Sequence, residues 1–301
     1  MRGGWVARRL DDSFSTRCMK NSILILTPTL GSSPYLDQTV QSIRQLDLSI
    51  RHIFVCPQNA RADLAKRFPN SEVIQDKGKE EGLYGALNAG LEAASAGGPE
   101  WDWFTYINDD DLLAPGFAEM VRRHCRPENL STVAYGDIET IDADGESLGW
   151  MTVERTPAYF PALLQLGISP TGQQGMLFGA PVVELLGGYD VRLNICADLE
   201  FWARAFARQI PFRYFPLPVG RFRIRPGQIS GSVSRLRTQM DQVVQMHFAA
   251  PVRPAARRFA QARYWWSNLP RYLGRMRSVG LARSFEVLET GGRGNAGGKP
   301  F

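Results

Sequence analysis

The chain has 301 residues and a formal net charge of +5, and 44% of its residues are hydrophobic, which is enough for a globular core. Its four cysteines form no CxxC pair and its three histidines lie far apart, so the pattern argues against a disulfide framework or a zinc site and favours a reducing cytoplasm. No apolar run approaches the roughly 18 residues that span a bilayer, and residues 1–19 lack the apolar segment of a secretory signal.

Strands and helices are expected to alternate over the first third of the chain. The hydrophobic patterns predict strands at 22–31, 50–57, 71–76 and 101–109 and helices at 33–46, 59–68 and 82–98. Such alternation is typical of right-handed βαβ units and a mostly parallel sheet. Ligands of these sheets bind at the carboxyl ends of the strands.

Three consecutive aspartates, Asp109, Asp110 and Asp111, end the fourth predicted strand. Adjacent carboxylates repel one another, and their burial is costly unless a positive charge joins them. Mg²⁺ and Mn²⁺ prefer oxygen ligands, so the cluster predicts a cation site, with a solvated acidic turn before Pro115 as the alternative. Because Asp111 lies at a strand end, we expect it outside the core.

The second half of the chain has a different pattern. Two strands joined by a turn at Asp144 and Gly145 are expected over 133–150, and the D-x-D-G inside them lacks the further ligands of a calcium loop. The remaining predictions are a helix at 156–167, a strand and a short helix at 173–190, a helix at 194–209 and an edge-type strand at 212–230. Asp198 falls in the first turn of the helix at 194–209, where the helix dipole favours a carboxylate.

Five segments, 25–31, 76–91, 107–117, 174–190 and 197–205, occur in an order that resembles the inverting family 2 glycosyltransferases, most closely the bacterial ones that build surface polysaccharides. The resemblance implies the GT-A fold, a Rossmann-like, mixed and mostly parallel α/β sheet flanked by helices. It implies a transferase domain at 20–245, preceded by an extension at 1–19 and followed by a basic, aromatic helical extension at 246–301.

The resemblance also implies a reaction. A sugar passes from a nucleotide-diphosphate-sugar donor to the hydroxyl of a glycan or lipid-linked acceptor, while a divalent metal (Mg²⁺ or Mn²⁺) holds the diphosphate. Asp111 corresponds to the metal ligand of the family, and Asp109 and Asp110 lie toward the metal and the ribose. The donor pocket is implied to comprise Pro28, Thr29, Asp76, Lys77, Gly78 and Asn88.

Asp198 corresponds to the catalytic base of the family. Glu200 is the alternative base, and its structural role would be a surface pair with Arg204. Arg223 and Arg225 face either the diphosphate or solvent.

The sequence departs from the family pattern in two places. Residues Cys56, Gln58 and Asn59 stand where relatives have acidic residues that contact the base, so the donor base stays open. Gln173 replaces a histidine on the acceptor side.

The C-terminal third is strongly basic, because Asp241 is the only acid between residues 201 and 284. In residues 251–278 arginines alternate with aromatic side chains, which suits a helix lying on an anionic membrane. A pair of helices packing their aromatic side chains on the transferase domain explains the pattern equally well. Residues 290–301 are expected to be disordered.

The resemblance and these features together predict a cytoplasmic, metal-dependent, inverting hexosyltransferase of cell-envelope glycan synthesis. A peripheral position at the inner face of the plasma membrane is compatible with the same features. A sugar nucleotidyltransferase is an alternative, but the glycine-rich triphosphate loop is missing after the first strand. A nucleic-acid-binding protein is the other alternative, suggested by the arginine-rich C-terminal third. It would leave the three aspartates unexplained, so no nucleic-acid partner is expected.

Overall fold

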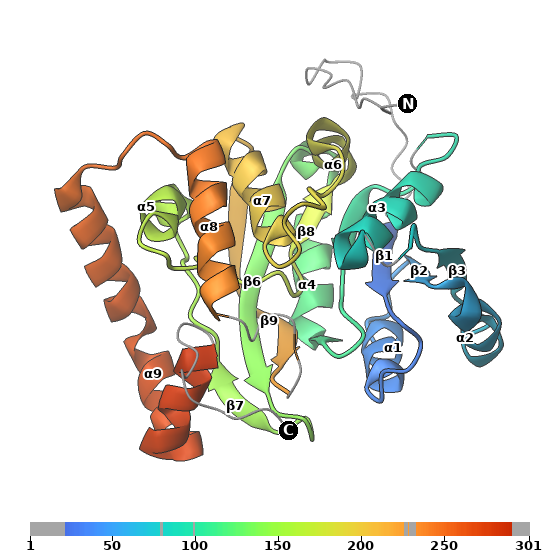
Figure 1. Ribbon diagram of the computed structural model, residues 1–301, viewed down its shortest axis with the longest axis horizontal. Coiled ribbons are helices and arrows are strands. Elements are labelled where there is room, and N and C mark those ends of the chain that lie inside the picture. The colour runs from blue at the N-terminus through green and yellow to red at the C-terminus, as the bar shows by residue number, and fades with distance from the viewer. Residues whose placement is uncertain (1–21, 79–80, 99, 226–227, 229–232, 291–301) are drawn as a thin grey trace.

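The structure, a computed structural model, describes residues 22–78, 81–98, 100–225, 228 and 233–290. The predicted extension at 1–19 lies outside these residues, as do residues 291–301 of the disordered tail predicted at 290–301, whereas Thr290 ends a helix. Figure 1 shows a mixed sheet through the middle of the molecule with helices packed around it.

The sheet has a parallel half and a mixed half, in which β6 and β9 keep the direction of the parallel strands while β8, β5 and β7 run the opposite way. Its order is β3 (Glu72–Gln75), β2 (Ile50–Cys56), β1 (Ile23–Pro28), β4 (Trp103–Tyr106), β8 (Leu177–Gly179), β6 (Val133–Ile141), β9 (Phe212–Arg223) and β5 (Leu112–Leu113), and β7 (Ser147–Trp150) pairs with β6. Strands β3, β2, β1 and β4 are parallel, whereas β8 is antiparallel to both β4 and β6. The parallel half therefore brings four carboxyl ends to one edge, as the sequence predicted.

The helices predicted before residue 210 are present, and α8 is one that the sequence did not predict. The helices are α1 (Leu36–Arg44), η2 (Gln58–Ala60), α2 (Arg61–Arg67), α3 (Gly82–Ala94), α4 (Pro115–His124), η3 (Pro127–Asn129), η4 (Pro157–Tyr159), α5 (Phe160–Leu164), α6 (Ala180–Leu186), α7 (Ala197–Ala207), α8 (Val233–His247) and α9 (Pro254–Thr290). Helix α6 ends at Gly187, whose φ of 74° suits a residue without a side chain.

The core lies on both faces of the sheet because side chains of each strand alternate in direction. Leu24 and Leu26 of β1 belong to the cluster that includes Leu87 of α3, while Ile23 and Ile25 belong to the cluster that includes Phe117 of α4. Helix α3 lies close to the sheet at Gly90, where an added Cβ would come within 2.8 Å of Leu26 and Val55 side-chain atoms. This close packing fixes α3, and with it the side chains that α3 directs toward the site.

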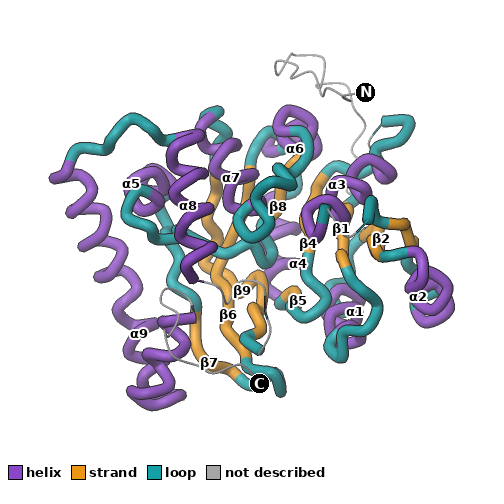
Figure 2. Tube along the Cα trace, in the orientation of Figure 1, coloured by secondary structure: helices purple, strands orange, loops and turns teal. Residues whose placement is uncertain are grey.

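Two sequence predictions about the second half are wrong. The strand at 212–230 is not an edge strand, because β9 lies between β6 and β5. The segment 251–278 does not form a pair of helices, because its residues from Pro254 onward belong to the single helix α9, which contains Pro270. Figure 2 shows α5 between α8 and α9, and α5 contacts both helices, while α9 also packs on β7.

Candidate active site

The site lies where β1 and β4 end side by side. Thr29 follows β1 directly, and its hydroxyl donates a 2.6 Å hydrogen bond to Oδ2 of Asp109. The Ser33 hydroxyl donates to the Asp109 carbonyl at 2.9 Å. Burial raises the pKa of Asp109, and the Thr29 hydrogen bond opposes that rise. Pro28, at the last position of β1, completes this junction, so the structure brings Pro28, Thr29 and Asp109 together.

Asp110 is held by two arginines from the end of β9. Its side chain is 6% exposed, and Oδ2 accepts a 2.7 Å hydrogen bond from Nε of Arg225. Its carbonyl accepts a 2.8 Å hydrogen bond from Nε of Arg223. Asp110 therefore has a cationic partner within the protein itself, the guanidinium of Arg225.

Asp111 is fully buried, so the prediction that it lies outside the core is wrong. Oδ1 accepts a 2.9 Å hydrogen bond from the Arg223 amide, and Oδ2 accepts hydrogen bonds from Gln174 at 2.9 Å and Asn108 at 3.2 Å. Burial and the neighbouring Asp110 carboxylate raise the pKa of Asp111 to about 7, although these three donors oppose the rise. Both oxygens therefore already have protein partners.

The carboxylates alone do not form a metal cage. Among the described residues, no three His, Cys, Asp or Glu side chains are arranged to hold a metal ion. Mg²⁺ is often bound through only one or two carboxylates together with substrate phosphates. Asp109 is half-buried, Asp110 is 6% exposed and Asp111 is fully buried, so Asp109 and Asp110 fit such a shared site better than Asp111.

Asp198 lies at the start of α7, and α3 and β4 direct tyrosines toward it. Oδ1 accepts a 3.0 Å hydrogen bond from the Tyr84 hydroxyl and a 2.8 Å hydrogen bond from the Leu199 amide. Burial raises the pKa of Asp198, and the hydrogen bonds from Leu199, Tyr84 and Tyr106 oppose that rise. Tyr106 ends β4 three residues before Asp109, so it links the predicted base to the aspartate cluster.

Glu200 forms the expected pair with Arg204 but is not a surface residue. Its side chain is 4% exposed, and its two oxygens accept hydrogen bonds from Arg204 and from Nε2 of His247, both at 2.8 Å. Arg204 also donates to the carbonyls of Leu186 and Gly188. Glu200 therefore joins α7 to α8, and this occupied position favours Asp198 over Glu200 as the base.

Asn88 binds a backbone segment of the opposite half of the site. Its Nδ2 donates to the Tyr189 carbonyl at 2.9 Å, and its Oδ1 accepts from the Tyr189 amide at 2.7 Å. An added Cβ at Gly188 would lie 2.7 Å from Asn88 Oδ1, so the approach requires glycine. Asn88 thus fastens α3 to the loop that leads to Asp198.

The other predicted donor residues follow β3. The Asp76 amide donates to the Cys56 carbonyl at 2.9 Å, and Asp76 Oδ1 accepts from the Gly78 amide at 3.0 Å. Nζ of Lys77 forms a 2.6 Å ion pair with Glu92 on α3. These residues lie at the same sheet edge as Pro28, two strands away. A pocket of about 400 Å³ nearby is lined by Gln58, Arg61, Ala62, Ala65, Ser71 and Val73.

Arg223, for which the sequence left the diphosphate or solvent as alternatives, does not face solvent. Its side chain is fully buried, it contacts the Tyr35 ring, and it donates to Gln38 of α1 and to the carbonyls of Asp110, Asp142 and Ala143. Alternating arginines on a strand gave no signal of such burial. Tyr106 could have been noted, because it is the polar-tipped residue that ends the strand before the aspartates.

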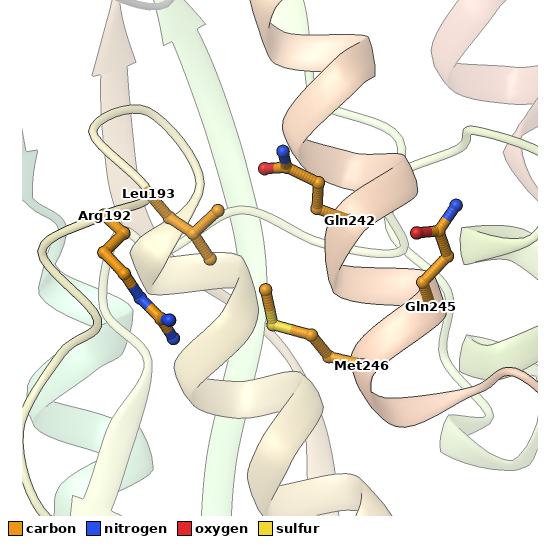
Figure 3. A pocket seen from close by; sticks show the side chains of 5 residues that line it. All are labelled: Arg192, Leu193, Gln242, Gln245 and Met246. Atoms are coloured by element: carbon orange, nitrogen blue, oxygen red, sulfur yellow. The ribbon is translucent and has the colours of Figure 1, made fainter.

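A further open pocket of about 420 Å³ lies beside the segment that leads to Asp198. Figure 3 shows Arg192 and Leu193 on that segment and Gln242, Gln245 and Met246 on α8. The neighbouring Gln239 of α8 accepts hydrogen bonds from the amides of Ile195 and Cys196 at 3.0 and 3.1 Å. Gln173, predicted on the acceptor side, is buried and donates to the Tyr106 carbonyl.

Comparison with known proteins agrees with this fold. The family model described as glycosyl transferase family 2 matches residues 24–174, half of the chain, so the chain belongs to that family. It is therefore a glycosyltransferase of the nucleotide-sugar class. The sequence matches no curated protein.

Two solved structures illustrate the shared fold. S. aureus TarS 1–349, solved in complex with UDP, is 14% identical with a TM-score of 0.53, and the match covers 89% of this chain and 78% of that one. Mannosyltransferase PcManGT from Pyrobaculum calidifontis, solved with GDP-Man and Mn2+, is 15% identical with a TM-score of 0.54, and the match covers 89% and 79%. At these identities the likeness supports the GT-A fold.

Proposed function

We propose that the protein transfers a sugar, with inversion at the anomeric carbon, from a nucleotide-diphosphate-sugar donor to a hydroxyl of a glycan or lipid-linked acceptor. The observation that carries the proposal is Asp198, a carboxylate of raised pKa linked through Tyr106 to the aspartates at the end of β4. Inversion needs one carboxylate to take the acceptor proton while the leaving group departs from the opposite side of the sugar. The structure offers a separate group of residues for each task.

Asp198 would act as the general base. Its raised pKa strengthens it as a proton acceptor, while the Leu199 amide and Tyr84 hydroxyl hold the carboxylate in place. These donors favour the ionised carboxylate and so offset part of the cost of its burial.

The donor diphosphate would bind at Asp109 and Asp110. A divalent ion held there would supply charge neutralisation for the departing diphosphate. Asp111 was predicted as a ligand, but its hydrogen-bonded oxygens favour a role in supporting Asp110 from inside. Pro28, Thr29, Asp76, Lys77 and Gly78 remain the proposed nucleotide side of the site, and Asn88 would hold its two halves together.

The base of the donor stays open, since the two solved relatives were obtained with UDP and with GDP-Man. A hexose donor, a cell-envelope glycan as product and a cytoplasmic location belong to the same proposal. They rest on the sequence resemblance, as does the division into a transferase domain at 20–245 and an extension from 246.

The test has two stages. Thermal shift with a panel of nucleotide sugars and Mn²⁺ should identify a stabilising donor, and release of nucleoside diphosphate with a glycolipid extract then measures turnover. Asp198→Asn should lower kcat by roughly 10²- to 10⁴-fold, because general-base catalysis contributes about that much, with donor affinity unchanged. Asp190→Asn is the matched control, because Asp190 lies on the preceding loop and pairs with Arg192.

Full turnover by the Asp198→Asn variant would exclude this base. If no nucleotide sugar stabilised the wild-type protein, the donor proposal itself would be wrong.

A further inference from the structure

Helix α9 has an inner face built from polar contacts. Tyr264 and Asn268 are buried, and the Tyr264 hydroxyl donates to Thr152 Oγ1 at 2.7 Å. Asn268 exchanges two hydrogen bonds with the backbone of Val153. Arg271 pairs with Asp137. The helix is therefore fixed to the segment around β7 without using most of its apolar side chains.

The opposite face of α9 is apolar and exposed. We call it the outer stripe, and its residues are Phe259 (59% exposed), Trp266 (78%), Leu269 (41%), Leu273 (42%) and Met276 (37%). Their successive spacings of seven, three, four and three residues place them on one side of a helix. Single exposed apolar residues are ordinary, but a continuous stripe marks an interaction surface.

The charge around the outer stripe is positive. Residues 242–285 contain no Asp or Glu. The inward arginines Arg263 and Arg271 are neutralised by Glu154 and Asp137 from the body of the protein. Arg253 and Arg258, near the start of α9, are exposed. Positive charge thus accompanies the apolar side chains on the outside of the helix.

We propose that the outer stripe of α9 lies in the headgroup region of an anionic lipid bilayer. Apolar side chains enter the acyl boundary while flanking arginines meet lipid phosphates, which is how amphipathic helices bind to a membrane surface. No helix in the described part of the chain is long and apolar enough to cross a membrane, so the contact is one of surface attachment. The inference rests on α9 alone and does not depend on sugar transfer.

Charge and shape disfavour two other occupants. A second copy would bring two acid-free, arginine-bearing helices against each other, which is repulsive. Single-stranded nucleic acid binds by stacking bases on successive aromatic rings. Three of the five residues of the outer stripe are Leu or Met, on which bases do not stack.

The test uses the full chain and vesicles of phosphatidylcholine, alone or mixed with phosphatidylglycerol. Wild type should sediment with the mixed vesicles and much less with the neutral ones. The triple variant Trp266→Ser, Leu269→Ser, Leu273→Ser should partition at least about tenfold more weakly, because these exposed side chains supply the apolar contact. Arg253→Gln and Arg258→Gln should each cost roughly fivefold.

Met246→Gln is the control for loss of exposed apolar surface, since Met246 is 48% exposed on α8. It should sediment like wild type, and all variants should keep the wild-type melting temperature. Equal sedimentation of the triple variant and wild type would overturn the proposal. The proposal would also be overturned if wild type did not bind vesicles and instead dimerised in a concentration-dependent way that the triple variant lost. Binding of a single-stranded oligonucleotide without vesicle binding would overturn it too.

Discussion

Asp198 experiences opposing influences on its pKa. Burial raises it, and three hydrogen-bond donors limit the rise. A general base must be ionised to work, so turnover should fall as pH falls through the pKa of Asp198. The acid limb of the pH–rate profile should therefore lie above pH 3.9, which is about the pKa of an exposed Asp.

Removal of a donor to Asp198 should move this limb. Tyr84→Phe deletes the 3.0 Å hydrogen bond to Oδ1, which favours the charged form, so the pKa of Asp198 should rise and the acid limb should shift to higher pH. The pH dependence of kcat/KM measures the shift. Tyr214→Phe is the matched control, because Tyr214 bonds Asp137 instead. If the acid limb of the kcat/KM profile did not move in Tyr84→Phe, the limb would belong to a group other than Asp198.

Arg225 and a metal ion should compete for Asp110. Arg225→Ala frees Oδ2 of Asp110 and removes a nearby positive charge, so the protein without nucleotide should bind Mn²⁺ more tightly, by about tenfold or less. Electron paramagnetic resonance of free Mn²⁺ gives the affinity directly. Arg221→Ala is the control on the same strand, because Arg221 pairs with Glu139. Weaker Mn²⁺ binding by Arg225→Ala would contradict the competition.

At the scale of single residues, the sequence identified the carboxylates of the site but not the groups that bind them. Runs of aspartate and an acid at the start of a helix are visible in one dimension. Tyr84 and Asp198 are 114 residues apart, and Arg223 and Asp111 are 112 apart. Such contacts exist only after the sheet and helices have assembled, so no local pattern indicates them.

At the scale of elements, Asp111 joins the end of β4 to the end of β9. Asp111→Asn would turn an amide NH₂ either toward the Arg223 amide or toward the side-chain amides of Gln174 and Asn108, all of which are donors. We expect a loss of about 1–3 kcal/mol in the free energy of unfolding, measured by urea denaturation at pH 8 without metal. Asp109→Asn, which disturbs a single hydrogen bond from Thr29, should cost less.

An unchanged unfolding free energy in Asp111→Asn, together with lost Mn²⁺ binding, would restore the sequence prediction that Asp111 is the metal ligand. The two roles are therefore separated by one pair of measurements.

The elements themselves were mostly predictable, because helix and strand periodicities are local. Leu36, Val40, Ile43 and Leu46 were spaced as one helical face, and all four are buried. The failure at β9 has a physical cause. Arginine at alternate positions normally marks a solvated strand, but Arg223 is buried because three backbone carbonyls from two segments surround its guanidinium.

At the scale of the whole molecule, buried histidines make the fold sensitive to acid. His52 bonds Thr27 and Ser71, and burial lowers its pKa to about 3. Burial likewise lowers the pKa of His124 to about 4. The unfolded chain takes up these protons near pH 6.5, so stability should be lost as pH falls below about 6.5.

His52→Gln should flatten this acid dependence, by roughly 2 kcal/mol at pH 5 relative to pH 8. Urea denaturation at a series of pH values gives the two curves. Comparison with wild type is needed because Asp111, with its pKa of about 7, acts with the opposite sign and destabilises the fold as pH rises. Parallel curves for the variant and wild type would exclude His52 as a cause.

The paired hydrogen bonds between Asn88 and the Tyr189 backbone determine how the site can move. They tie α3 to the loop that leads to Asp198, the proposed base, and Tyr84 repeats the tie through Asp198 and the Ile195 carbonyl. We therefore expect these two sides of the proposed site to move together and not to separate around a larger sugar. The site should then accept donor sugars only up to a fixed size, and adaptation to a bulkier sugar should require smaller side chains on its two sides.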